Sequence, residues 1–451
     1  MFDLEFNIRS WSDYLRSHGS FKNADILEME SHLRDEIDEL TQNGLSTEEA
    51  FLIGVKRLGN VNQISHEFHK VNSEDFWKHL LFESKDPIES RKARTNIILV
   101  IAFSLFAGTL LKVPELFGMH LIDDSSMMFY FKNISLFLFP FVALFFMVNH
   151  VSSRKWKVAI LSVFVITALI INVYPSFFPN STELLTAFHL PILLWLVTGL
   201  AFLGKEWRSS RKRMDFIRFS GETFIYGVLI FCGLMVFILF SVMLFSAIQV
   251  DISRFTVEYL IVYGGSAVLM VSVYLVEAKK SVVENFTPIL AKIFSPLFLM
   301  TMIAFLIAML ILGKSPFMER DFLIGFDFML VLVLALVLYV ISSRGLHDKA
   351  NVHDFLNFAL IVAALIINSI ALAAILFRLS MYGITPNKVA ALGENILLMV
   401  NLGGLAWLYS SYFMKKIEFQ RLENWQTNYL SLYFGWMAVV VFLLPIVFSF
   451  R

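Results

Sequence analysis

Five polar side chains inside long apolar stretches are the residues of this sequence best suited to chemistry. Asp327, Arg378 and Glu394 carry charge, whereas Tyr382 and Asn401 offer a phenol and an amide. Ionisable groups within a membrane are costly unless they are paired or hydrated, so their presence points to a functional or locking role. Glu394 and Asn401 are seven residues apart, which places them on one face of a helix. The five predict either an ion-pair network that locks helix ends together, or a polar cavity that takes a solute or a proton.

Two further amides, Asn368 and Asn395, lie in the same apolar stretches. A buried carboxylate costs much less beside an arginine than alone. We therefore expect Asp327 or Glu394 to lie near Arg378.

Metal and catalytic chemistry have little support in the sequence. His66 and His69 are three residues apart, whereas the zinc protease pattern needs its histidines four apart, so a solvated helix face is favoured over a metal site. Cys232 is the only cysteine and lies in an apolar run, which excludes a disulfide or a zinc knuckle within the chain. The sequence has no phosphate-binding loop, hydrolase elbow or dinucleotide fingerprint. We predict a protein that is not an enzyme and that has no cofactor and no metal site.

Composition places the chain outside the soluble classes. Apolar residues make up 57% and charged residues 16% of 451 residues, against roughly 45–50% and 25% in soluble domains. This excludes a soluble enzyme, a disordered chain, a nucleic-acid binder and a secreted disulfide scaffold. The formal net charge is zero, yet residues 1–90 hold 9 basic and 18 acidic side chains. The asymmetry predicts an acidic domain at 1–90 and a membrane domain at 91–451.

Eleven apolar runs after residue 95 are long enough to span a membrane. Assigning the loops alternately puts 20 Lys and Arg on the side of the N-terminus and 7 on the other. Because basic loops stay in the cytoplasm, the N-terminus is predicted inside and the C-terminus outside. The fold class is therefore all-α and polytopic, with ten or twelve spans as the alternatives to eleven. The runs are 96–114, 128–149, 156–174, 187–204, 221–249, 256–276, 295–313, 322–342, 355–377, 391–412 and 430–450.

The acidic domain is predicted to be a cytosolic bundle of five short helices. Ser46 and Glu49 form a predicted capping box, and Gly44 and Gly59 are predicted helix ends. The order of an acidic helix, a glycine stop, this box and the run Arg57-Leu58-Gly59-Asn60 resembles the permease-prefix type of bacterial helical domain. The resemblance covers about residues 24–70 and implies a bacterial protein in which this domain has a regulatory role.

A second motif lies between the ninth and tenth runs. In Arg378-Leu-Ser-Met-Tyr-Gly-Ile-Thr-Pro-Asn387, Gly383 supplies a turn, Thr385 caps the next helix and Pro386 suits its first position. The motif resembles the bacterial membrane family known as domain of unknown function 4153. The resemblance implies a membrane architecture over roughly residues 95–450 and a place in the bacterial inner membrane, but no activity.

A basic segment at Lys205, Arg208, Arg211, Lys212 and Arg213 is the strongest charge cluster. In a cytosolic loop it would attract anionic lipid, and the alternative is that it docks the acidic domain. Nucleic-acid binding is not expected, because no folded basic surface accompanies the segment.

These patterns together predict a multi-pass protein of the bacterial inner membrane. The leading hypothesis is a permease-like protein of unknown substrate with a cytosolic regulatory domain. The alternative is a membrane signalling or scaffold protein that does not transport and whose acidic domain binds a cytosolic regulator.

Overall fold

A computed structural model describes residues 4–18, 23–42, 45–58, 87–121, 123–150, 152–278, 286–312, 317, 320–344 and 350–451. The chain divides into two compact units, Met1–Ala93 and Arg94–Arg451. All regular elements in the described residues are helices, in agreement with the predicted fold class.

The first unit contains three described helices, α1 (Leu4–His18), α2 (Asn23–Gln42) and α3 (Thr47–Leu58). Their shared core includes Ile8 and Leu33, both fully buried. The predicted capping box is present: the Glu49 carboxylate accepts from the Ser46 backbone N–H at 3.0 Å and from its hydroxyl at 2.6 Å. These hydrogen bonds from Ser46 hold the pKa of Glu49 below its usual value. The two further predicted helices of this domain lie outside the described residues.

The second unit supplies all eleven candidate spans found among the described residues, the number predicted from the sequence. Several begin earlier than their apolar runs, because polar first turns precede the hydrophobic part. The helices are α6 (Pro87–Lys112), α7 (Asp124–Asn149), α8 (Arg154–Val173), α9 (Ser181–Leu203), α10 (Ser210–Ala247), α12 (Val262–Ala278), α13 (Phe286–Leu312), α14 (Arg320–Ser342), α15 (Val352–Tyr382), α16 (Pro386–Phe413) and α17 (Gln420–Ala438). Short helical segments extend four of them: η1 (Val113–Phe117), η2 (Gly204–Glu206), α11 (Ser253–Phe255) with η3 (Thr256–Ile261), and η4 (Val439–Leu443) with α18 (Leu444–Val447).

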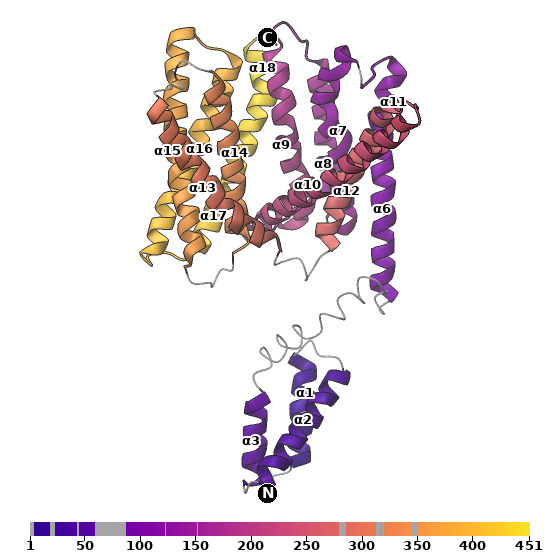
Figure 1. The fold of residues 1–451 in the computed structure, drawn as a ribbon, viewed down its shortest axis with the longest axis vertical. Coiled ribbons are helices and arrows are strands. Elements are labelled where there is room, and N and C mark those ends of the chain that lie inside the picture. The colour runs from indigo at the N-terminus through magenta and orange to yellow at the C-terminus, as the bar shows by residue number, and fades with distance from the viewer. Residues whose placement is uncertain are drawn as a thin grey trace. The chain divides into compact units, whose positions relative to one another are not determined.

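The spans pack around two separate apolar cores. The first helix group, α6 to α9 with α12, surrounds a core that includes Phe145 and Leu194. The second helix group, α13 to α16, surrounds a core that includes Leu330 and Ile367. Helices α10 and α17 contribute to both cores. In Figure 1 the second group lies on the left and the first group on the right, with α9 and α18 between them.

We call the end of this unit where α9 and α16 begin and the C-terminus lies the upper end, because it is at the top of Figure 1. The lower end carries Arg344 and Lys415. At the upper end, the Phe450 carbonyl accepts from the Phe177 N–H in the α8–α9 loop, and the Arg451 carbonyl accepts from the Thr182 N–H in the first turn of α9.

Glycines allow close helix crossings in this unit. A Cβ at Gly393 would lie 1.9 Å from the Trp436 ring, and one at Gly404 would lie 2.2 Å from the Trp425 ring. Both contacts join α16 to α17, so these two helices approach closely only because the glycines lack side chains. Equivalent pairs join other helices: Gly108 with Tyr263, Gly199 with Phe216, and Gly221 with Tyr339.

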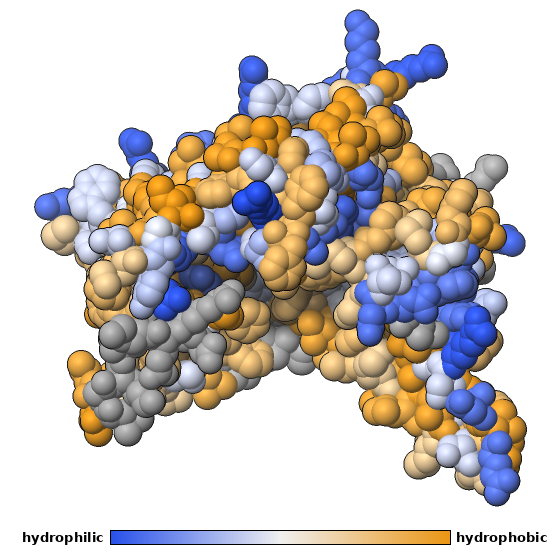
Figure 2. All heavy atoms as spheres, turned by 90° about the horizontal axis from the view of Figure 1, so that it is seen from above, coloured by the Kyte–Doolittle hydropathy of each residue, from blue (hydrophilic) through white to orange (hydrophobic). Residues whose placement is uncertain are grey.

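Large apolar side chains cover the outer surface of the spans, as expected of a surface that faces lipid. Leu239 of α10 is 69% exposed, and Leu310 of α13 is 78% exposed. Seen from above, hydrophilic residues lie among hydrophobic ones, and hydrophobic residues reach the edges of the molecule (Figure 2). Helix α10 has 38 residues and slants across the first helix group (Figure 1).

Candidate functional site

A histidine and a glutamate join the two helix groups. His189 Nε2 of α9 lies 2.5 Å from Glu394 Oε1 of α16, and the two side chains are 12% and 25% exposed. His189 Nδ1 lies 2.7 Å from the carbonyl of Leu185 and donates to it, since a carbonyl only accepts. This second bond fixes the imidazole so that Nε2 faces the carboxylate. We call the contact between α9 and α16 the seam.

The next residue on α16 extends the polar contacts into the second helix group. Asn395 Nδ2 donates to Asp327 Oδ1 of α14 at 3.0 Å and to the Ala391 carbonyl at 2.8 Å. Asn368 Nδ2 of α15 donates to the Asn395 carbonyl at 3.0 Å. Four helices thus contribute to one polar region, here called the seam cluster: His189, Asp327, Asn368, Glu394 and Asn395.

The seam cluster lies inside the spans rather than at their ends. His189 and Glu394 each lie about two turns from the start of their helices at the upper end. Asp327 lies seven residues from the start of α14. At this depth a bilayer provides no water for polar groups, so each group depends on protein partners or on a bound ligand.

The seam is apolar above the cluster, and a cavity lies beside α9 below it. Above, Leu185 packs with Ala390, Val440 and Leu444. Below, an open cavity of about 220 Å³ lies between α9, the start of α10 and α17, and is lined by Leu196 and Leu430 among others. Leu185, His189 and Leu196 share one face of α9, because they are separated by four and seven residues. Along α9, the cluster therefore lies between the apolar contacts of the seam and this cavity.

The five residues predicted as a polar cluster belong to three places. Asp327 and Glu394 are both in the seam cluster. Arg378 lies at the upper end of α15, where its guanidinium carbon is 5.7 Å from the centroid of the Tyr382 ring. Tyr382 is 60% exposed and also faces the Lys388 ammonium at 5.6 Å. No ion pair of Arg378 with Asp327 or Glu394 is found among the described residues, contrary to our expectation.

Asn401 belongs to a different network, between α16 and α17. Its amide nitrogen donates to Tyr433 Oη at 2.8 Å and to Gln426 Oε1 at 3.2 Å, and its amide oxygen accepts from Trp425 Nε1 at 2.8 Å. Asn401 is fully buried. It shares the face of α16 with Glu394 as predicted, but its amide is fully used in joining two helices.

Sequence reasoning missed His189. Its run, Thr186-Ala187-Phe188-His189-Leu190-Pro191, shows a single histidine in an apolar stretch, which was the available signal. Its partner Glu394 is 205 residues later in the chain.

A second set of buried charges lies at the lower end. Arg344 Nε is 2.9 Å from Asp354 Oδ1, and the two side chains are 6% and 2% exposed. Arg344 Nη2 donates to Tyr412 Oη at 2.7 Å, and the guanidinium lies 4.1 Å from the centroid of the Phe419 ring. Asp354 Oδ2 accepts from the Asn351 backbone N–H at 2.9 Å, which completes a capping box at the start of α15. We call Arg344, Asn351, Asp354, Tyr412 and Phe419 the lower-end cluster.

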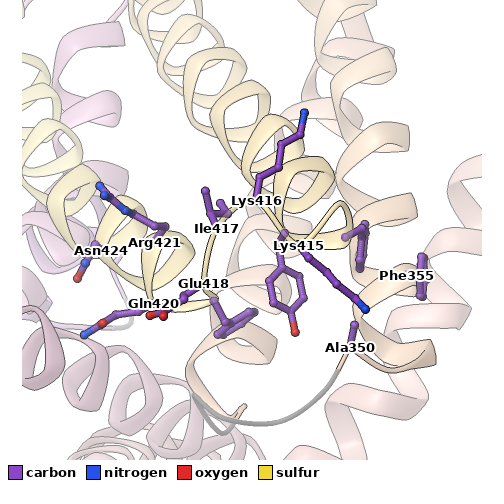
Figure 3. A pocket seen from close by; sticks show the side chains of 12 residues that line it. Ala350, Phe355, Lys415, Lys416, Ile417, Glu418, Gln420, Arg421 and Asn424 are labelled. Carbon is purple, nitrogen blue, oxygen red and sulfur yellow. The ribbon is translucent and has the colours of Figure 1, made fainter.

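A cavity of about 1040 Å³ lies beside this cluster and is open to the surface. It carries the basic residues Lys415, Lys416 and Arg421, but their side chains point in different directions, and only Lys415 extends toward Ala350 (Figure 3). Because the three cations do not converge, the cavity does not form a site for a single anion.

The predicted basic segment is partly helical. Ser209 accepts from the Lys212 N–H and begins α10, so Arg211, Lys212 and Arg213 lie in its first turn rather than in a loop. Arg213 is half-buried and donates to the carbonyls of Trp207 and Thr427. Lys205, Arg208, Arg211 and Lys212 are exposed.

Within the described ranges, no three His, Cys, Asp or Glu side chains lie close enough together to hold a metal ion. His66 and His69 lie outside those ranges. No family model, no curated protein and no solved structure matches the chain. The two family resemblances therefore stay predictions, and the geometry of the seam cluster is the basis for a function.

Proposed function

We propose that this protein is a permease of the bacterial inner membrane, and that its solute crosses along the seam. The proposal depends on one observation: a polar contact, His189 with Glu394, joins two helix groups that each have their own apolar core. Ionisable residues within spans commonly mark solute or ion pathways. Two helical groups that rock against each other around a central site give alternating access.

The shape of the seam supports this proposal. The apolar contacts of Leu185 with Val440 and Leu444 would close the upper side, while the cavity at Leu196 and Leu430 would open the lower side. In the alternate state, the upper contacts would separate and the cavity below would close.

Orientation and partners form part of the proposal. We place the N-terminus in the cytoplasm, where the first unit would act as a regulatory domain. The lower end then faces the cytoplasm, and the exposed cations Lys205, Arg208, Arg211 and Lys212 would bind anionic lipid.

Cysteine accessibility tests the transport proposal. In a Cys232→Ser background, single cysteines replace Leu185 above and Leu196 below the seam cluster. We expect a membrane-impermeant maleimide to label Leu196→Cys from the lower side and Leu185→Cys from the upper side in the same preparation.

Leu239→Cys, which lies on the surface expected to face lipid, serves as the unlabelled control. If neither seam position is labelled from either side, the seam is sealed, and the signalling or scaffold alternative replaces transport. A reporter fused after Arg451 tests the orientation, since a cytoplasmic signal there would contradict it.

A further inference from the structure

Three residues of the seam cluster, Asp327, Asn368 and Asn395, have more hydrogen-bond acceptors than donors among them. Both N–H groups of the Asn395 amide are used, by Asp327 Oδ1 and by the Ala391 carbonyl. The Asn368 amide nitrogen donates to the Asn395 carbonyl. In the described part of the chain, the amide oxygens of Asn368 and Asn395 have no hydrogen-bond partner, although these residues are 0% and 1% exposed.

Turning the amides over does not remove this excess. A reversed Asn395 would bring its oxygen against Asp327 Oδ1 and the Ala391 carbonyl, which are both acceptors. A reversed Asn368 would face the Asn395 carbonyl in the same way. The orientations are therefore set by the neighbours, and within the described residues the two oxygens remain acceptors without a donor. A buried acceptor without one is costly.

Asp327 also has an unbalanced charge. It makes no ion pair with a Lys, Arg or His within the described residues, and its one hydrogen bond comes from the neutral Asn395. The charged group near enough to act on it is Glu394, another carboxylate, which already faces His189. Hydrogen bonds thus link Asp327 of α14, Asn368 of α15 and Asn395 of α16, which together offer one carboxylate and, within the described residues, two amide oxygens without a partner.

We propose that Asp327, Asn368 and Asn395 bind a monovalent alkali-metal cation such as sodium. Carboxylate and carbonyl oxygens suit hard cations, and membrane transporters hold sodium with such groups at the middle of the bilayer. A single charge on the cation balances the single carboxylate, whereas calcium and magnesium sites use more carboxylates or waters. A role for this cation in driving transport rests on the proposed function, but its binding does not.

Thermal unfolding of the full chain in lipid nanodiscs, followed by tryptophan fluorescence, tests the binding. Sodium chloride replaces N-methylglucamine chloride at constant ionic strength and constant pH. We expect the melting temperature of the wild type to rise with sodium by a few degrees and to saturate, as for any ligand that binds the folded state. In Asp327→Asn, which keeps the side-chain shape, this rise should disappear.

Asn357→Ala is the matched control, because Asn357 is also fully buried on α15 with an unpartnered amide oxygen, but donates to Tyr409 nearer the lower end. It should keep the sodium response, while Asn395→Ala should lose it. Sodium-23 NMR line broadening by the wild type, absent with Asp327→Asn, provides a second measurement if a variant folds poorly.

The proposal would be overturned if neither the melting temperature of the wild type nor the sodium-23 line width responded to sodium. A full rise in the melting temperature of Asp327→Asn with sodium would also overturn it. A melting temperature that responds to pH alone would identify a proton as the occupant and would also overturn it. Sodium binding combined with a sealed seam in the cysteine assay would leave the cation site standing and reject transport.

Discussion

The lower-end cluster and the seam cluster both bury ionisable side chains, but the two clusters give these side chains different partners. At the lower end Arg344 balances Asp354, and Tyr412 and Asn351 take further bonds. At the seam, Asp327 has only a neutral amide for a partner, and two buried amide oxygens nearby have none within the described residues. A paired set of charges holds helices in place, whereas an incomplete set has capacity for a ligand. We therefore assign structure to the first region and binding to the second.

The largest effect is expected from breaking the lower-end pair. Arg344→Met leaves the Asp354 carboxylate buried without its cation, which should lower the free energy of unfolding by about 3–5 kcal/mol. Unfolding in detergent, followed by tryptophan fluorescence, measures it. Lys415→Met, at an exposed site of the same end, is the control and should have little effect. Equal stabilities of the two variants would contradict the structural role of the pair.

A packing change should affect the seam cluster without altering its polar atoms. Gly393 precedes Glu394, and an alanine Cβ would collide with the rigid Trp436 ring. Gly393→Ala should therefore lower the free energy of unfolding by about 1–3 kcal/mol through overpacking, and it should shift the Trp436 fluorescence.

Gly403→Ala on the same helix is its control, because a Cβ there would meet no described atom within 4 Å. If both alanines were tolerated equally, close packing would not position the seam cluster.

Two buried asparagines of the second helix group provide a direct comparison. Asn401→Leu leaves Trp425, Gln426 and Tyr433 short of a partner, whereas Asn368→Leu loses one hydrogen bond and removes an unpartnered oxygen. Without sodium, Asn401→Leu should therefore be less stable than Asn368→Leu by about 1 kcal/mol. Chemical denaturation in N-methylglucamine chloride measures the difference. The reverse order would mean that Asn368 is structural.

The smallest effect on stability is expected at an exposed carboxylate, Glu49, outside both clusters. Hydrogen bonds from Ser46 lower the pKa of Glu49, so their contribution to stability is present above the pKa of the unfolded chain and is lost as the pH falls through the folded pKa. Glutamate-selective carbon-13 NMR of the full chain should include a titration below the usual range that disappears in Glu49→Gln and moves upward in Ser46→Ala. An unshifted Glu49 would show that the capping box does not form.

Local patterns predicted much of the fold, and tertiary contacts account for what they missed. Apolar runs gave the number of spans, and Thr385 caps α16 with Pro386 in its first position as expected. The candidate site was only half predicted. Asp327 and Asn395 are 68 residues apart and His189 and Glu394 are 205 apart, so no local spacing could pair them. Arg378 was assigned to the carboxylates because opposite charges attract, yet it lies beside the Tyr382 ring at the helix end.

The length of α10 has a consequence for how lipid acts on the seam. At 38 residues it extends about 57 Å, and its apolar part alone is longer than the roughly 30 Å hydrocarbon thickness of a bilayer, so the helix must tilt to keep its apolar residues in lipid. Its first turns pack in the second helix group through Met214 and Ile217, and Phe219 packs in the first. Hydrophobic mismatch would therefore be transmitted through α10 to the contact between the two groups. Under the proposed transport function, acyl-chain length, rather than headgroup charge alone, would adjust how far the seam opens.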